Sequence, residues 1–198
     1  MNQIRIAAPI ACFMLEDMRT ARYVLRRYAG DSKCALPLGY HNAESDSVAE
    51  RPEVTDKPYT GTNPPEIALD DPRWPTACAC GYAFTPEDAR QVFAHGLYSR
   101  VDTGKVMTWD EAPAGAIRDA SWWPDKGADG HAWGIKLPDG NEWMTESSAS
   151  NCVCRTKDQP PEHRCWSRSG VAPILTVSPS LGMPRWHGWL RDGKLVQA

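Results

Sequence analysis

The chain has 198 residues and a formal net charge of −3, with 41% hydrophobic and 24% charged residues. This length and apolar content suffice to bury the core of one ordinary domain. The charge balance excludes both a strongly basic nucleic-acid-binding surface and the acidic, weakly hydrophobic composition of a disordered chain. The least ordinary totals are nine tryptophans, 17 prolines and seven cysteines.

The first segment, residues 1–38, is predicted to form a strand and then an amphipathic helix. Residues 3–15 are mostly apolar and indicate a strand or a buried segment, whereas residues 16–30 place apolar side chains at helical spacing and end at Gly30. The helix is expected to bury Met18, Ala21, Val24, Leu25 and Tyr28, and to expose Arg19, Arg22, Arg26 and Arg27 as a solvated face.

The apolar run at residues 4–15 is too short to span a bilayer and lacks the order of regions found in a signal peptide. We therefore expect no membrane association and a cytosolic protein. In that compartment its cysteines are reduced thiols rather than disulfides.

The middle segment, residues 39–76, is rich in proline and polar residues and is predicted to be an extended loop or linker. A short helix is expected next, over residues 85–96. Thr85 is its predicted N-cap, Pro86 occupies its first position, Asp88 completes a capping-box-like pattern and Gly96 ends it.

Three hairpins are predicted after this helix, at residues 97–109, 131–145 and 186–196. Each contains an Asp–Gly or Asp–x–Gly turn between apolar runs, which is typical of two-stranded antiparallel units. The expected fold class is therefore α+β, with mainly antiparallel hairpins, a few short helices and a core over residues 77–198.

The cysteines form pairs that suggest a metal site. The sequence contains "CAC" at 78–80, "CVC" at 152–154 and "HRC" at 163–165. In an extended segment, residues i and i+2 point to the same side, so each pair offers two donors to one point, and zinc takes four such donors. The glycine after the second cysteine allows a tight turn whose N–H groups point at thiolate sulfur. The predicted zinc ligands are Cys78, Cys80, Cys152 and Cys165.

Other donors remain open in this interpretation. Cys154 and His163 are substitutes for the later ligands, and Cys34 is unassigned, whereas Cys12 in its apolar run is read as a small buried side chain. Four cysteines leave no coordination position for water, which favours a structural zinc ion that staples the core. If His163 or a carboxylate left one position open, a zinc-bound water would be a nucleophile with Glu162 or Asp158 as base.

The tryptophans are expected to serve mainly as core residues. Trp133 and Trp143 lie in facing strands of one predicted hairpin, where cross-strand aromatic pairs form. The alternative is an exposed platform that stacks on sugars or bases. No recognised signature of a hydrolase or metalloprotease is present, and we assign no catalytic residues.

Several sequence blocks in the second half of the chain resemble blocks found in a known group of proteins. "GAIRDASWWPD", "LPDGNEWMTESSASNC", "HRCWSRSGVAPILTVSPSL" and "WHGWLRDGKLV" occur in the same order as similar blocks of uncharacterised tailed-phage and prophage proteins, and the resemblance covers about residues 75–196. In that group "ASNC" and "HRCW" are the recurring cysteine blocks, which match Cys152, His163, Cys165 and Trp166. The resemblance implies a phage-borne gene and no established activity.

These observations together predict a non-enzymatic, zinc-stabilised binding module encoded by a phage. We expect a protein partner of host or phage origin, in the host cytoplasm or as a minor component of the virus particle. The alternatives are a metal-dependent hydrolase or nuclease with an open zinc position, and a tryptophan-rich platform that binds carbohydrate or nucleic acid.

Overall fold

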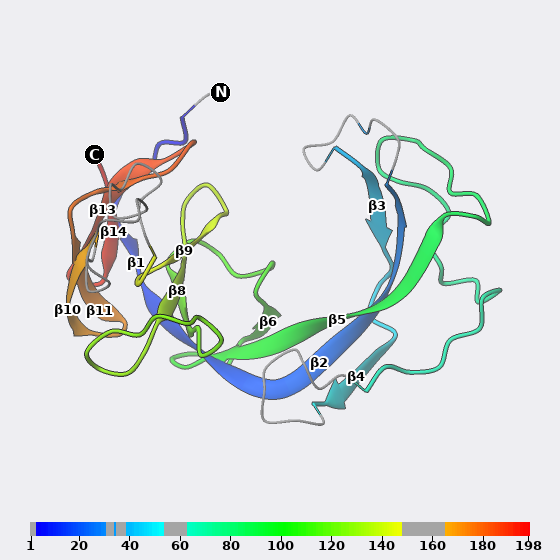
Figure 1. Ribbon diagram of the computed structural model, residues 1–198, viewed down its shortest axis with the longest axis horizontal. Coiled ribbons are helices and arrows are strands. Elements are labelled where there is room, and N and C mark those ends of the chain that lie inside the picture. Colours follow the sequence, from blue (N-terminus) through cyan, green and yellow to red (C-terminus); the bar gives the residue numbers. More distant parts are fainter. Residues whose placement is uncertain (1–2, 31–33, 35–38, 54–62, 148–164) are drawn as a thin grey trace, which may run out of the picture. The chain divides into compact units, whose positions relative to one another are not determined.

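The computed structural model describes residues 3–30, 34, 39–53, 63–147 and 165–198. Every regular element within these residues is a β-strand (Figure 1). The predicted α+β class is therefore wrong, and the described part of the chain is all-β. It contains no helix with the length and apolar character needed to cross a membrane.

The chain divides into two compact units. The first unit comprises residues 1–17 and 98–198, and the second unit comprises residues 18–97. Strands β2 (Phe13–Ala29) and β5 (Ala89–Arg100) contribute residues to both units.

The strands that contribute to the first unit fall into three groups. One sheet has the order β1-β14-β13-β12, β10 and β11 form a separate antiparallel hairpin, and β6, β5, β2, β7, β8 and β9 are neighbours in that order. The start of β2 pairs with β7 in parallel, with Phe13 opposite Ala116. The bounds are β1 Ile10–Ala11, β6 Val106–Thr108, β7 Ala116–Asp119, β8 Trp133–Lys136, β9 Glu142–Met144, β10 Ser167–Val171, β11 Ile174–Ser178, β12 Leu181–Gly182, β13 His187–Arg191 and β14 Lys194–Gln197.

The three predicted hairpins are confirmed as β5–β6, β8–β9 and β13–β14. The last one turns at Asp192 and Gly193, which have φ angles of 46° and 68°. Two successive residues with positive φ are what a tight two-residue hairpin turn requires, because this turn matches the right-handed twist of its strands. An Asp–Gly pair adopts this conformation at low cost.

The main core of the first unit gathers buried side chains from β7, β8, β9, β11, β12, β13 and β14 and from the residues between them. Trp186 is fully buried and Trp143 is 5% exposed within one hydrophobic cluster, and Trp133 and Trp166 pack against that cluster from its edge. The expectation that Trp133 and Trp143 belong to a core is therefore confirmed. Trp122, in contrast, is 44% exposed.

The second unit is organised around the later part of β2. Strands β3 (His41–Glu44) and β4 (Ala49–Pro52) both pair with β2 antiparallel, and β5 is also its neighbour. The predicted loop over residues 39–76 is therefore wrong where β3 and β4 form. Residues 54–62 of that loop lie outside the described residues.

The predicted helix over residues 16–30 is wrong because the segment also carries a period of two. Alternate side chains at 21, 23, 25, 27 and 29 are buried. Met18 and Tyr28, which a helix would have buried, are 40% and 39% exposed. Hydrogen bonding to β3 and β4 satisfies the backbone of this segment, so tertiary pairing overrides its helical pattern.

The predicted helix over residues 85–96 is wrong for a related reason. The capping residues do interact, since the Thr85 N–H donates to Asp88 Oδ2 at 2.7 Å and the Asp88 N–H donates to the Thr85 carbonyl at 3.1 Å. These bonds close a single turn, after which the chain extends into β5 at Ala89. A capping pattern thus marks a turn here and not a helix start.

Removal of a core side chain from the first unit should be far more costly than removal of an exposed one. Leu190 is fully buried in β13, so Leu190→Ala should lower the free energy of unfolding by about 2–5 kcal/mol through lost burial and a cavity. Val171 is 80% exposed, and Val171→Ala should change it by less than about 0.5 kcal/mol. Denaturant unfolding followed by tryptophan fluorescence measures both, and equal losses would contradict the described core.

Candidate metal centre

Four soft donors come together in the second unit. They are the thiols of Cys34, Cys78 and Cys80 and the imidazole of His41, whose donor atoms all lie within 4.8 Å of one another. Cys34 Sγ is 3.9 Å from Cys78 Sγ, and His41 Nδ1 is 3.1 Å from Cys80 Sγ. The four side chains therefore lie close enough to hold a metal ion, and none of the three cysteines is in a disulfide.

A tight loop presents the two cysteines of the "CAC" element. An isolated antiparallel bridge joins Ala77 to Ala83 at its base, and the Cys78 N–H donates to the Tyr82 carbonyl at 2.8 Å. The Gly81 N–H then donates to the Cys78 carbonyl at 2.9 Å, with Gly81 at a φ of +94°. This backbone conformation favours glycine, which explains the glycine directly after Cys80.

Strand pairing and ring stacking fix the position of His41. It is the first residue of β3 and lies opposite Ala29 of β2, which keeps its side chain 5% exposed. Its ring stacks on the ring of Tyr82 with centroids 4.0 Å apart and planes 6° from parallel. The Tyr82 hydroxyl donates to Asp88 Oδ2 at 3.2 Å, which fixes the ring on which His41 stacks.

The surroundings of Cys78 favour its thiolate form. Backbone N–H groups, first that of Cys80 and then that of Asn42, point at the sulfur, and together with the His41 and Cys80 side chains they lower the pKa of the Cys78 thiol to about 6. Cys78 itself is buried. Thiolates are the metal-binding form of cysteine, and N–H groups directed at sulfur offset their charge.

Cys12 has the opposite environment. It packs beside the main core cluster of the first unit, and burial raises the pKa of its thiol to about 12. A thiol that stays protonated in apolar surroundings is inert toward metals, as expected for a small packing side chain.

The structure brings together two of the four predicted ligands, Cys78 and Cys80. Cys165 is a half-buried residue of the first unit and does not belong to the group of four. Cys152 lies outside the described residues, as do its substitutes Cys154 and His163. The role predicted for Cys152 and Cys165 therefore stays a prediction.

Sequence reasoning left Cys34 unassigned and did not consider His41. The two are separated by six residues, which is wider than the two to four residues typical of zinc ligand pairs. His41 reaches the centre only because β3 pairs with β2. The one local signal was Gly39, which has a φ of 72° just before β3.

Comparisons with known proteins add no family assignment. No protein-family model matches this chain, and no match to it is found among the curated proteins or the solved structures. Inference about its role therefore depends on the donor cluster and the surfaces around it.

Replacement of single donors should separate the two candidate ligand sets. Purified protein should hold about one equivalent of metal by elemental analysis, and Cys34→Ser and His41→Ala should each lose most of it, because a tetrahedral site tolerates few missing donors. Cys165→Ser, with the same chemical change outside the cluster, should keep its metal. Retention by Cys34→Ser together with loss by Cys165→Ser would instead favour the ligand set predicted from sequence.

Proposed function

We propose that Cys34, His41, Cys78 and Cys80 hold a structural zinc ion. A set of three cysteines and one histidine is a recognised donor set for structural zinc, which binds with tetrahedral geometry. With metal–sulfur bonds of about 2.3 Å, tetrahedral geometry separates two sulfurs by about 3.8 Å. The separation of 3.9 Å between Cys34 Sγ and Cys78 Sγ agrees with that value and is the observation that carries the proposal.

The ion would fasten three separate segments of the second unit. Cys34 follows β2, His41 begins β3, and the loop of Cys78 and Cys80 precedes β5. The strands β3 and β4 have only four residues each, so they add little burial of their own. Because such a site does not preform in an unfolded chain, its binding free energy contributes directly to folding.

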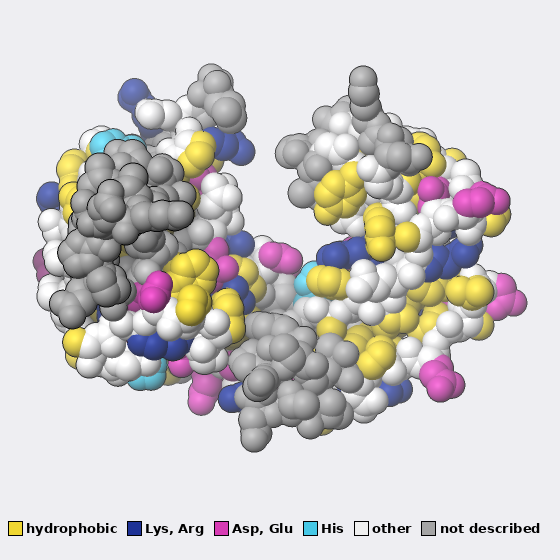
Figure 2. All heavy atoms as spheres, viewed as in Figure 1, with side chains coloured by type: hydrophobic (Ala, Val, Ile, Leu, Met, Phe, Trp, Pro, Cys, Tyr) yellow, Lys and Arg dark blue, Asp and Glu magenta, His cyan; other side chains and the backbone are white. Residues whose placement is uncertain are grey.

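The surface beside this centre supports a role in protein binding. A cavity of about 330 Å³ in the second unit is lined by Arg26, Tyr28, Gly30, Tyr40, Asn42 and Gln91. Tyr28 and Tyr40 are each 39% exposed, and Tyr40 and Asn42 flank the donor His41 in the chain. On the face shown in Figure 2, hydrophobic and basic side chains lie next to one another over this unit. Tyrosine and arginine are the residue types most often found at interface hot spots.

The proposed function is therefore that of a zinc-stabilised, non-enzymatic module that binds a protein partner. Four protein donors fill a tetrahedral shell, which supports a structural ion over one that activates water. A phage origin, with action in the host cytoplasm or in the particle, rests on the sequence resemblance alone and is part of the proposal.

Removal of the ion should destabilise the second unit selectively. Treatment with a strong chelator should speed amide hydrogen exchange in β3 and residues 76–84, with a loss of local stability of about 3 kcal/mol or more, while β13 and β14 of the first unit keep their protection. Mass-spectrometric hydrogen exchange measures both regions. In Cys34→Ser, which already lacks the ion, the chelator should have no further effect. Equal exchange before and after chelation of the wild-type protein would contradict a structural ion.

A protein partner should contact the surface formed by Tyr28 and Tyr40. A photo-crosslinking amino acid placed at either position should capture the same partner in infected or expressing cells, because both side chains line one cavity. The matched control is the same label at Leu69, which is 71% exposed in the same unit. Capture from Leu69 as efficient as from the two tyrosine positions would contradict a defined interface.

A further inference from the structure

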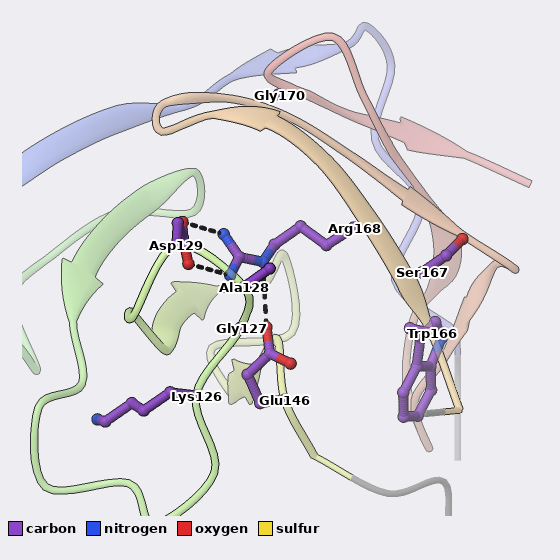
Figure 3. Close-up of a pocket in the computed structure, with 9 residues that line it drawn as sticks. All are labelled: Lys126, Gly127, Ala128, Asp129, Glu146, Trp166, Ser167, Arg168 and Gly170. Atoms are coloured by element: carbon purple, nitrogen blue, oxygen red, sulfur yellow. Dashed lines mark hydrogen bonds and ion pairs between the residues drawn. The ribbon is translucent and has the colours of Figure 1, made fainter. Parts of the chain in front are cut away.

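A second cavity lies in the first unit, remote in sequence from the metal ligands. It has a volume of about 670 Å³, and the lining residues that matter here are Lys126, Gly127, Asp129, Glu146, Trp166 and Arg168 (Figure 3). Small-ligand sites have volumes of about 300–1,000 Å³ and combine an apolar wall with a few fixed polar groups. This cavity has both.

Arg168 holds the two carboxylates of the cavity in place. Its guanidinium donates to both oxygens of Asp129 at 2.7 Å and to Glu146 Oε1 at 3.1 Å, and a further N–H reaches the His131 carbonyl at 3.2 Å. The Arg168 and Glu146 side chains are only 10% and 7% exposed. Such a bidentate, charge-assisted network fixes geometry as well as charge.

Gly127 is part of the same arrangement. A Cβ at this position would collide with the Arg168 guanidinium and approach Glu146 Oε1 to 2.9 Å. Glycine therefore lets the turn over residues 127–130 lie directly against the ion pair, where the Gly130 N–H donates to the Gly127 carbonyl at 2.9 Å.

The protein already engages the two cationic groups of this cavity, and its carboxylates remain as acceptors. Lys126 Nζ donates to the carbonyls of Ala120 and Ser121 at 3.0 Å, and Arg168 is engaged as described. The carboxylates keep spare lone pairs, because each oxygen accepts more than one hydrogen bond. Among the described residues, none donates to Glu146 Oε2. The cavity thus suits a ligand that presents hydrogen-bond donors.

The charges and the aromatic side chain of the cavity lining further restrict the class of ligand that fits. The lining contains two carboxylates and two cationic side chains, so it favours no net charge on the ligand. Arg168 and Asp129 stay ionised together, since Arg168 holds the pKa of Asp129 well below its usual range. Trp166 lies two residues before Arg168, and its ring is fixed edge-on against Trp143, with centroids 5.4 Å apart. An indole provides a flat apolar surface for a ring that carries C–H groups.

We propose that this cavity binds a neutral saccharide. Its hydroxyl groups would donate to Glu146 and Asp129, and its C–H surface would pack on Trp166. A sugar meets all three conditions, because it is uncharged, rich in hydroxyl donors and apolar on its ring faces. The proposal does not rest on the metal centre, whose ligands all belong to the second unit.

The test is a glycan array that carries neutral and charged oligosaccharides, followed by calorimetric titration of the full-length protein with the strongest neutral saccharide. We expect a Kd below about 1 mM. Glu146→Gln keeps the size of the side chain and removes its charge, and it should weaken binding about 10-fold or more, because hydrogen bonds to charged groups are the strong ones.

The matched control is Asp102→Asn, the same carboxylate-to-amide change at an exposed residue that pairs with Arg100 in the same unit. It should leave the affinity unchanged. Thermal unfolding of each variant shows whether it is folded. Trp166→Phe, which keeps an aromatic ring, is a second test of the site, and it should weaken saccharide binding a few-fold. Absence of neutral saccharide binding, binding of charged glycans only, or equal affinity of wild type and folded Glu146→Gln would each overturn the proposal.

Discussion

Three thiols and one imidazole converge on one point in the second unit, and we propose that this unit depends most on that convergence. Gathering sulfur ligands around one point is electrostatically costly unless a cation and directed N–H groups offset their charge. Cys78 receives such N–H groups from Cys80 and Asn42, and His41 is held by its stack on Tyr82. The loop of Cys78 and Cys80, the strand β3 and the stack of His41 on Tyr82 are thus arranged around the donor atoms. With a zinc ion in place, these short elements become a single fastened structure.

Strand β2 provides the frame on which this centre is assembled. Its alternating buried side chains at 21, 23, 25, 27 and 29 form one face, while residues 26–29 pair with β3 and residues 20–23 pair with β4. The pairing of Ala29 with His41 sets the register that delivers the histidine. A shift by one residue would turn His41 to the other face of the strand. The same register places Tyr28 opposite Asn42, and both residues line the cavity of the proposed contact surface. The pairing of β2 with β3 therefore positions both the metal centre and that surface.

Hairpin turns and the Cys78–Cys80 element were predictable from sequence, whereas the strands at 16–30 and 89–96 and the long-range contacts were not. The hairpin at Asp192–Gly193 was predicted because its turn chemistry is contained within a few residues. The segment at 16–30 carried helical and strand periodicities at once, and only pairing with β3 and β4 decided between them. Cys78 and Cys80 were recognised by their spacing and by Gly81. His41 was not, because its place in the centre follows from strand register and no spacing rule relates it to Cys34.

The most direct measurement of the central claim is zinc X-ray absorption spectroscopy on the purified protein. The account predicts a first shell of three sulfurs at about 2.3 Å and one imidazole nitrogen at about 2.0–2.1 Å. The imidazole contribution should be absent from the spectrum of any metal retained by His41→Ala. A shell of four sulfurs, a shell dominated by oxygen, or protein that holds no zinc would contradict it.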